Sequence, residues 1–277
     1  MEQEMIREGG IYCRVVGSGP TVALLHGFGE DGKVWDELIP HLKGPYRLLI
    51  PDIPGSGRSP IRLDRSTMPS IDALADSLLA LLSSENTQKG KVILTGHSMG
   101  GYLALSIAAR FPEIVGGLAL VHSTAYADSE EKKANRTKSM AFIKEQGSKK
   151  YLQQSIPGLF GRHYKETHPV QLRNWVEHYA SAFPSETLNH YLTAMRDRPD
   201  RTATLKQWSA PIAWVIGEED QAVPLQHSLE QAQMAHEPVV CRMEKIGHMG
   251  MIEAPESVGP FLHAYFMNII QNPEKHL

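Results

Sequence analysis

Short apolar runs alternate along this chain with longer segments in which apolar residues recur every three or four positions. The runs are residues 21–25, 46–50, 91–95, 117–121 and 212–216, with 239–243 as a further candidate. Runs that lack a polar residue at every second position are typical of strands buried on both faces of a parallel sheet. Residues 11–16 predict another strand, and residues 5–7, which precede Gly9 and Gly10, predict its hairpin partner.

Three segments between these runs have helical spacing. Ser70 is a suitable N-cap for a helix whose apolar residues repeat from Ile71 to Leu82. Residues 99–110 predict a second helix, and a third begins near Pro255. Strands that alternate with helices imply right-handed βαβ crossovers. The sequence therefore predicts an α/β fold with a doubly wound, mostly parallel sheet.

Residues 124–206 break this alternation. They contain no strand pattern, only short amphipathic pieces interrupted by glycine and proline, and the alternation resumes after Pro211. An insertion of this kind between two core strands predicts a helical cap over one edge of the sheet. We therefore expect a core domain of residues 1–123 and 207–277 and a cap, or lid, of residues 124–206.

Composition narrows the class of protein. With 277 residues, 42% hydrophobic and 21% charged, the chain can bury a core without a metal or disulfide. A formal charge of −3 does not provide the positive electrostatic field that would attract nucleic acid. Cys13 and Cys241 lie far apart near apolar runs, which favours two buried free thiols. No run is long enough to span a membrane, and the acidic start lacks a signal peptide's apolar stretch, so a cytoplasmic location is expected.

One motif points to chemistry. Gly96-His97-Ser98-Met99-Gly100 follows an apolar run directly and opens the helix predicted for residues 99–110. The pattern G-x-S-x-G is weak alone, but a strand, a sharp turn and a helix are the context it requires. Ser98 would project its hydroxyl above the sheet at a helix N-terminus, where free N–H groups favour developing negative charge.

With these residues the chain resembles the α/β-hydrolase superfamily, over its whole length except the cap. Four further segments, in the family's order, carry the resemblance. They are the H-G-x-G segment His26-Gly27-Phe28-Gly29, the D-x-P-G-x-G-x-S segment from Asp52 to Ser59, Gly217-Glu218-Glu219-Asp220, and Gly247-His248-Met249 followed by Glu253-Ala254-Pro255-Glu256. The resemblance implies the α/β-hydrolase fold and a serine hydrolase.

It also implies roles for individual residues. Ser98 would be the nucleophile, His248 the general base and Asp220 the acid that orients the imidazole. The backbone N–H groups of Phe28 and Met99 would bind the oxyanion. Glu218, Glu219 and Asp128 are rival acids, and alignment to G-x-x-D favours Asp220.

The expected activity is cleavage of a carboxylic ester of a small or medium substrate through an acyl-enzyme, without cofactor or metal. Related dehalogenases and epoxide hydrolases use an aspartate nucleophile, which Ser98 argues against. Carbon–carbon bond hydrolases of this fold typically have tryptophan and asparagine where this chain has Met249 and His97. Two alternatives stay open: a carbon–carbon hydrolase or enol-lactonase acting on an anionic diketone or lactone, and a catalytically idle ligand-binding protein. The partner would be a small molecule, and the sequence leaves a homodimer open.

Three residues are candidates for binding substrate: His122, Phe142 and Trp175. A satisfied buried histidine is the other interpretation of His122. Residues 124–206 hold 14 Lys/Arg and 9 Asp/Glu, so the predicted cap is basic. A basic cap could attract an anionic substrate, although solvated helix faces would give the same excess. The arginines that could grip a carboxylate are Arg136, Arg162 and Arg173.

Overall fold

The computed structural model describes residues 2–6, 10–60, 68–85 and 91–272. Its strands form an eight-stranded sheet in the order β1-β2-β4-β3-β5-β6-β7-β8. Strands β3 to β8 pair in parallel, and β1 and β2 are antiparallel. The strands are β1 (Glu2–Ile6), β2 (Tyr12–Gly17), β3 (Thr21–Leu25), β4 (Arg47–Pro51), β5 (Val92–His97), β6 (Val115–Val121), β7 (Ile212–Gly217) and β8 (Pro238–Met243). The predicted sheet is confirmed.

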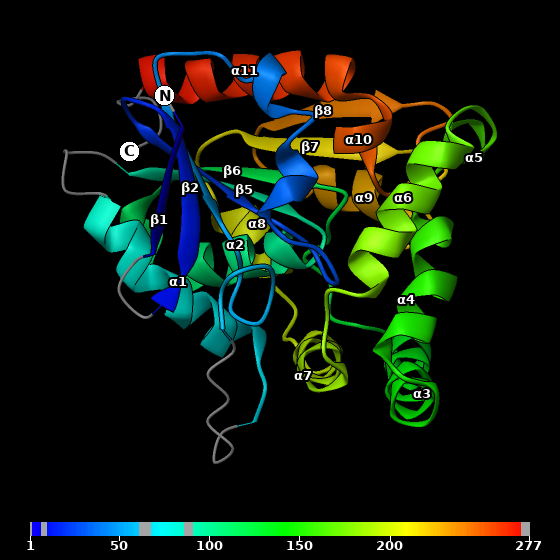
Figure 1. Cartoon of the computed structure of the whole chain (residues 1–277). Coiled ribbons are helices and arrows are strands. Elements are labelled where there is room, and N and C mark those ends of the chain that lie inside the picture. Colours follow the sequence, from blue (N-terminus) through cyan, green and yellow to red (C-terminus); the bar gives the residue numbers. More distant parts are fainter. Residues whose placement is uncertain (1, 7–9, 61–67, 86–90, 273–277) are drawn as a thin grey trace.

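Helices flank the sheet and fill the segment between β6 and β7. The helix α11 lies on one side of the sheet, and α1 and α2 lie on the other (Figure 1). The α-helices are α1 (Ile71–Glu85), α2 (Met99–Arg110), α3 (Glu130–Gln146), α4 (Ser148–Ser155), α5 (Arg162–Thr167), α6 (Pro169–Ala180), α7 (Ser185–Arg196), α8 (Thr202–Gln207), α9 (Leu225–Ala232), α10 (Gly250–Glu253) and α11 (Pro255–Gln271). The 3₁₀ turns are η2 (Gly32–Trp35), η3 (Ile39–His41), η5 (Pro112–Ile114) and η6 (Ile156–Leu159).

The local signals behave as the sequence predicts. The helix of residues 99–110 is observed with those bounds, and the Ser70 hydroxyl accepts a hydrogen bond from the N–H of Ala73 at 3.0 Å. In β3, β5 and β7 every residue is buried, as expected of strands covered on both faces. Strand β1 pairs with β2, while the turn that would complete the predicted hairpin falls at residues 7–9, outside the described residues.

The prediction for the cysteines is correct for one and wrong for the other. Both are free thiols, and Cys13 is fully buried within β2. Cys241 is only partly buried because it lies on β8, the edge strand, where neighbouring Val239 and Val240 are exposed. None of the described helices is long and apolar enough to cross a membrane.

The segment between β6 and β7, called the helical insertion below, holds α3 to α8 and no strand among its residues. In Figure 1 its helices α3 to α6 lie beyond the carboxyl ends of the central strands, and α8 lies beside α2. The loops that follow β3, β5, β6 and β7 therefore face the helical insertion. These loops carry the residues that the sequence singles out.

Candidate active site

The serine turn between β5 and α2 has a strained backbone. Ser98 has φ 49° and ψ −114°, a conformation that side-chain-bearing residues rarely adopt. Its N–H donates to the carbonyl of Val121 at 3.0 Å, and its carbonyl accepts the hydroxyl of Ser123 at 2.7 Å. A Cβ on Gly100 would lie 2.1 Å from the carbonyl oxygen of Leu25, so only glycine lets α2 approach β3 this closely. Packing and hydrogen bonds on both sides hold the strained serine in place.

An aspartate and a histidine meet beside this turn. Asp220 Oδ2 lies 2.8 Å from Nδ1 of His248, and both side chains are almost fully buried. The other oxygen, Oδ1, accepts the N–H groups of Ala222 and Val223 at 2.8 and 2.9 Å. Burial alone would raise the pKa of Asp220, but His248 and His122 hold it well below its usual range. The carboxylate is thus fixed and negative, and it faces Nδ1 of His248.

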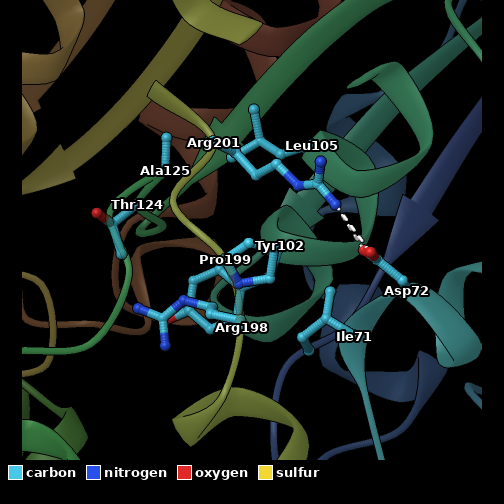
Figure 2. A pocket seen from close by; sticks show the side chains of 9 residues that line it. All are labelled: Ile71, Asp72, Tyr102, Leu105, Thr124, Ala125, Arg198, Pro199 and Arg201. Atoms are coloured by element: carbon cyan, nitrogen blue, oxygen red, sulfur yellow. Dashed lines mark hydrogen bonds and ion pairs between the residues drawn. The ribbon is translucent and has the colours of Figure 1, made fainter. Parts of the chain in front are cut away.

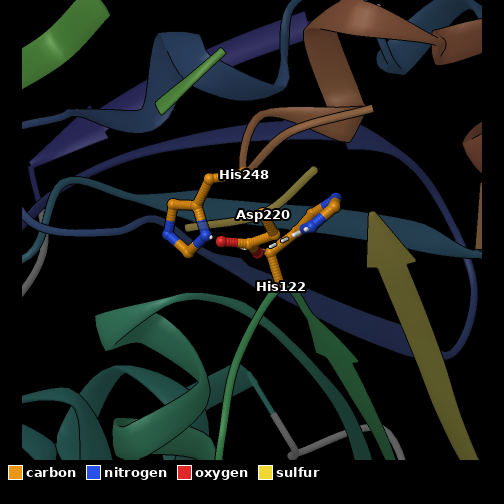
Figure 3. Close-up of side chains that lie close together, drawn as sticks. All are labelled: His122, Asp220 and His248. Atoms are coloured by element: carbon orange, nitrogen blue, oxygen red, sulfur yellow. Dashed lines mark hydrogen bonds and ion pairs between the residues drawn. The ribbon is translucent and has the colours of Figure 1, made fainter. Parts of the chain in front are cut away.

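The same carboxylate holds a second histidine on its opposite side (Figure 3). His122 Nδ1 lies 3.3 Å from Asp220 Oδ2, and its Nε2 accepts the N–H of Gly250 at 3.2 Å. Because Nε2 is the acceptor, Nδ1 carries the proton and the ring is neutral. Burial lowers the pKa of His122 to about 4, which agrees with a neutral ring. His122 is 1% exposed, so its contacts fit the satisfied buried histidine better than a substrate-binding residue.

These three side chains are also the group whose geometry could hold a metal ion. Their ligand atoms lie within 4.8 Å of one another. Asp220 Oδ2, however, accepts hydrogen bonds from both imidazoles, and its partner oxygen accepts two backbone N–H groups. Each oxygen of the carboxylate therefore already accepts two hydrogen bonds within the described residues.

The histidine loop is tied to the serine turn through His97. His97 Nε2 donates to the carbonyl oxygen of His248 at 3.0 Å, and the two rings lie 4.9 Å apart. Its Nδ1 lies 3.0 Å from Oε2 of Glu30, a fully buried carboxylate that also accepts the N–H of Gly27. Burial would raise the pKa of Glu30, but His97 lowers it on balance. Three strand-end loops are thus linked around the residue that precedes Ser98.

The electrostatics of His248 suit a base. Its pKa is raised above the ordinary value of 6.5, since the charge and hydrogen bond of Asp220 outweigh the effect of burial, which would lower it. With Nδ1 bonded to Asp220, the other nitrogen, Nε2, is the one that can exchange a proton with a hydroxyl.

The three rival acids have other partners. Glu218 faces Arg242, and Glu219 accepts the backbone N–H of Arg162 at the start of α5. Asp128 pairs with Arg136 and Arg198.

Phe28 and Met99, the residues predicted to form the oxyanion hole, have backbone N–H groups that are available to donate hydrogen bonds. Among the described residues, neither the N–H of Phe28 nor that of Met99 donates a hydrogen bond. Met99 is the first residue of α2, where backbone N–H groups have no partner within the helix. The helical insertion contacts the loop after β3, because the ring of Phe28 meets those of Tyr151 and Tyr191 edge-on, each with centroids 6.4 Å apart.

The helical insertion also contacts the histidine loop. The N–H of His248 donates to the carbonyl of Leu159 at 2.6 Å. Glu253 accepts N–H groups from Gly161 in the insertion at 2.8 Å and from Gly247 and Met249 in the loop at 3.1 Å. Burial raises the pKa of Glu253. One carboxylate therefore joins the two regions.

The other two predicted substrate-binding residues lie apart. Phe142 packs on Tyr151, whose ring contacts Phe28, so Tyr151 joins it to the loop after β3. Trp175 packs on Phe160 and Tyr179 and lines a groove of about 810 Å³ beside Ile246 and Glu253. None of Ser98, Asp220 and His248 lines that groove.

Sequence reasoning missed Glu30 and Glu253 as site residues. Glu253 lies in a segment quoted for the family resemblance, but a sequence does not show that a glutamate is buried. Glu30 carries no signal beyond its place just after the H-G-x-G segment.

Comparison with known proteins agrees with this architecture. The chain belongs to the α/β-hydrolase fold family, which matches residues 20–255. An esterase from Thermogutta terrifontis, solved with malate bound, superposes with a TM-score of 0.86 at 26% identity, over 97% of this chain and 99% of that one. The enol-lactonase from Burkholderia xenovorans superposes with a TM-score of 0.81 at 20% identity, over 98% and 100% of the two chains.

Among sequences, one similar protein is the dihydrolipoyllysine-residue acetyltransferase component of the acetoin cleaving system from Pseudomonas putida. It is 28% identical over 251 residues, which cover 89% of this chain and 63% of that longer protein. The predicted family and fold class are therefore confirmed.

Proposed function

We propose that this protein is a serine hydrolase that cleaves a carboxylic ester of a small or medium substrate. The observation that carries the proposal is the 2.8 Å contact between Asp220 and His248 beside a serine held at a strained strand-to-helix turn. The 26% identity to an esterase over nearly the whole of both chains supports ester chemistry. Lactones, which are cyclic esters, are included because an enol-lactonase shares the fold.

The reaction would proceed in two halves. His248 Nε2 takes the proton of the Ser98 hydroxyl as its oxygen attacks the ester carbonyl. The backbone N–H groups of Phe28 and Met99 stabilise the resulting oxyanion. His248 then gives its proton to the departing alcohol, and an acyl-enzyme remains. A water molecule, deprotonated by His248, attacks the acyl group, and Ser98 recovers its proton as the acid leaves.

Asp220 and His122 act on the base rather than on the substrate. The Asp220 carboxylate fixes the His248 tautomer and stabilises the imidazolium formed during attack. His122 donates to the same oxygen and so restrains the carboxylate. We also propose that residues 124–206 act as a cap over the site, because the insertion contacts both the loop of Phe28 and the histidine loop.

Two measurements test this function. A fluorophosphonate probe should label the native protein rapidly and the Ser98→Ala variant not at all, because only an activated serine reacts quickly. A panel of 4-nitrophenyl esters and lactones should show turnover that Ser98→Ala abolishes. A correctly folded protein that neither reacts with the probe nor turns over any ester would contradict the proposal and favour a ligand-binding role.

A further inference from the structure

The helical insertion contains a buried cluster with one more positive than negative charge. Asp128, whose side chain is fully buried, accepts from Arg198 at 2.6 Å and from Nε of Arg136. Burial would raise the pKa of Asp128, but the two guanidinium groups lower it on balance, so the carboxylate is charged. Two arginines against one carboxylate give these three side chains a net charge of +1, and the Arg136 side chain is 20% exposed whereas Asp128 and Arg198 are buried.

The two arginines differ in how far their donors are used. Arg198 donates to the carbonyls of Tyr126 and Met195 as well as to Asp128, and its guanidinium lies 4.0 Å from the ring centroid of Tyr102. In Figure 2 it points away from the ion pair between Arg201 and Asp72. Nη1 of Arg136, by contrast, has only the thioether of Met195, at 3.6 Å. Arg136 faces Asp128 through Nε and, at 3.4 Å, through Nη2, so Nη1 is the nitrogen whose recorded partner is only a weak acceptor.

Contacts on two helices place Arg136 on the side of the molecule that carries Phe28 and Ser98. Met195, which Nη1 of Arg136 contacts, lies one turn of α7 after Tyr191, whose ring contacts Phe28. Arg198, which shares Asp128 with Arg136, lies 4.0 Å from the ring centroid of Tyr102. Tyr102 lies four residues after Ser98 on α2, which is one helical turn along the same face. The Tyr151 ring contacts Phe28. Neither phenol hydroxyl has a hydrogen-bond partner within the described parts of the chain, so both remain able to bind a ligand.

We propose that Arg136, with the hydroxyls of Tyr102 and Tyr151, binds a carboxylate that the substrate carries apart from its ester bond. This inference rests on the proposed esterase function and narrows its substrate class to anionic esters. Asp128 balances only one of the two guanidinium groups, and a carboxylate matches the remaining single charge and the planar donors of Arg136. Arg162 and Arg173, the other two candidates, are exposed, and Arg162 faces Glu219.

Kinetics on matched esters test the proposal. 4-Nitrophenyl hemiglutarate carries the carboxylate on the acyl side, and 4-nitrophenyl pentanoate is its neutral match. 4-Acetoxybutanoate carries it on the alcohol side, and butyl acetate is its match. In at least one pair, kcat/KM for the anionic ester should exceed that for the neutral ester about tenfold or more, as a charged, partly buried contact implies.

Arg136→Met is the diagnostic variant, because Asp128 keeps its bond to Arg198. It should lower kcat/KM for the preferred anionic ester about ten- to a hundredfold while the neutral ester stays within about threefold. Arg173→Gln removes the same charge from an exposed position and should change neither. Equal turnover within both pairs, or an anionic preference that survives in Arg136→Met, would overturn the carboxylate subsite and leave the esterase intact.

A binding measurement keeps the two proposals separable. Calorimetric titration of glutarate into Ser98→Ala requires no turnover, and affinity should fall about tenfold or more in Ser98→Ala/Arg136→Met. Glutarate that does not bind Ser98→Ala, or binds both proteins equally, would overturn the subsite. Absence of turnover on every ester together with Arg136-dependent glutarate binding would instead reject the esterase and retain the anion site.

Discussion

The helices α2 and α3 show how differently the core and the helical insertion are built. The helix α2 buries ten of its 12 residues, whereas α3 buries only Ile143 of its 17. The core therefore gains its stability chiefly from apolar area removed from water, at about 25 cal/mol per Å². The insertion shares apolar packing with the core through residues such as Leu188, and it adds directional contacts, such as Tyr179 to Asp31 at 3.0 Å and Tyr191 to the carbonyl of Pro54 at 2.6 Å.

This difference suggests that the core loops give the site its rigidity and that the insertion gives it its substrate specificity. Loops at the ends of buried strands are held by the packing of the whole sheet, so a strained residue such as Ser98 is stable there. Contacts made by a few hydrogen bonds can change without unfolding the sheet. We therefore expect variants in the core loops to alter chemistry, and variants at the contacts of the insertion to alter stability and substrate binding.

The largest expected effect is in the core. Ser98→Ala should lower kcat by a factor on the order of 10⁵ or more, because members of a triad act as a unit. Its unfolding midpoint in urea should equal or exceed that of the native protein, since alanine removes no packing group. Substantial turnover by a folded Ser98→Ala protein would contradict the assignment.

Asp220→Asn should lower kcat by roughly 10²–10⁴, since an amide presents the wrong partner to His248. Glu219→Gln is the matched control on the same loop. In the native protein the Glu219 carboxylate accepts the backbone N–H of Arg162 at 2.7 Å, and the amide oxygen of glutamine can accept the same N–H. Steady-state kinetics should show little change for that control. If the two variants exchanged behaviour, Glu219 would be the acid.

The dependence of kcat/KM on pH reports on the same pair. A base must be neutral, and the pKa of His248 is raised above 6.5, so activity should fall as pH drops through a value above 6.5. The loss should reach about tenfold per pH unit below that point. In Asp220→Asn the inflection should move to lower pH, because the carboxylate that raises the pKa is gone. If the inflection did not move, the fall in kcat/KM at low pH would report the titration of a group other than His248.

Glu253→Gln tests the carboxylate that joins the two regions. The amide keeps one acceptor oxygen, so N–H groups of Gly161, Gly247 and Met249 lose part of their bonding. We expect a loss of about 1–3 kcal/mol in the free energy of unfolding, measured in urea. Activity should fall as well, because His248 lies in the loosened loop. Unchanged stability and activity would show that the insertion is held elsewhere.

The smallest expected effect is at a single hydrogen bond between the insertion and the core. Tyr179→Phe removes one hydrogen bond to Asp31, which still accepts the N–H of Lys33, and should cost about 1 kcal/mol. Tyr164→Phe is the matched control, since the Tyr164 hydroxyl makes no hydrogen bond within the described residues. Thermal unfolding should separate the two variants by a few degrees. Equal stability would remove Tyr179 as an anchor.

The sequence by itself determined the sheet and the order of the chemical segments. Strands such as residues 21–25 are apolar throughout because both faces are covered, and α2 has the bounds expected because Ser98 precedes it and Pro112 follows it. These signals are local, since neighbours along the chain produce them. The candidate triad could be predicted because Ser98, Asp220 and His248 each lie in a short segment that resembles a motif of the α/β-hydrolase superfamily.

Only the tertiary structure decided what those residues touch. His122 shares Asp220 from 98 residues away, His97 meets Glu30 across 67, and Glu253 reaches Gly161 across 92. The periodicity of apolar residues along the sequence does not show which strand ends lie together, because parallel strands bring segments that are distant in sequence to one edge of the sheet. The charge excess of the insertion was visible as composition, but only the fold brings Arg198, 70 residues beyond Asp128, to the carboxylate that also pairs with Arg136. Burial decides which charges matter, and burial is a property of the folded chain.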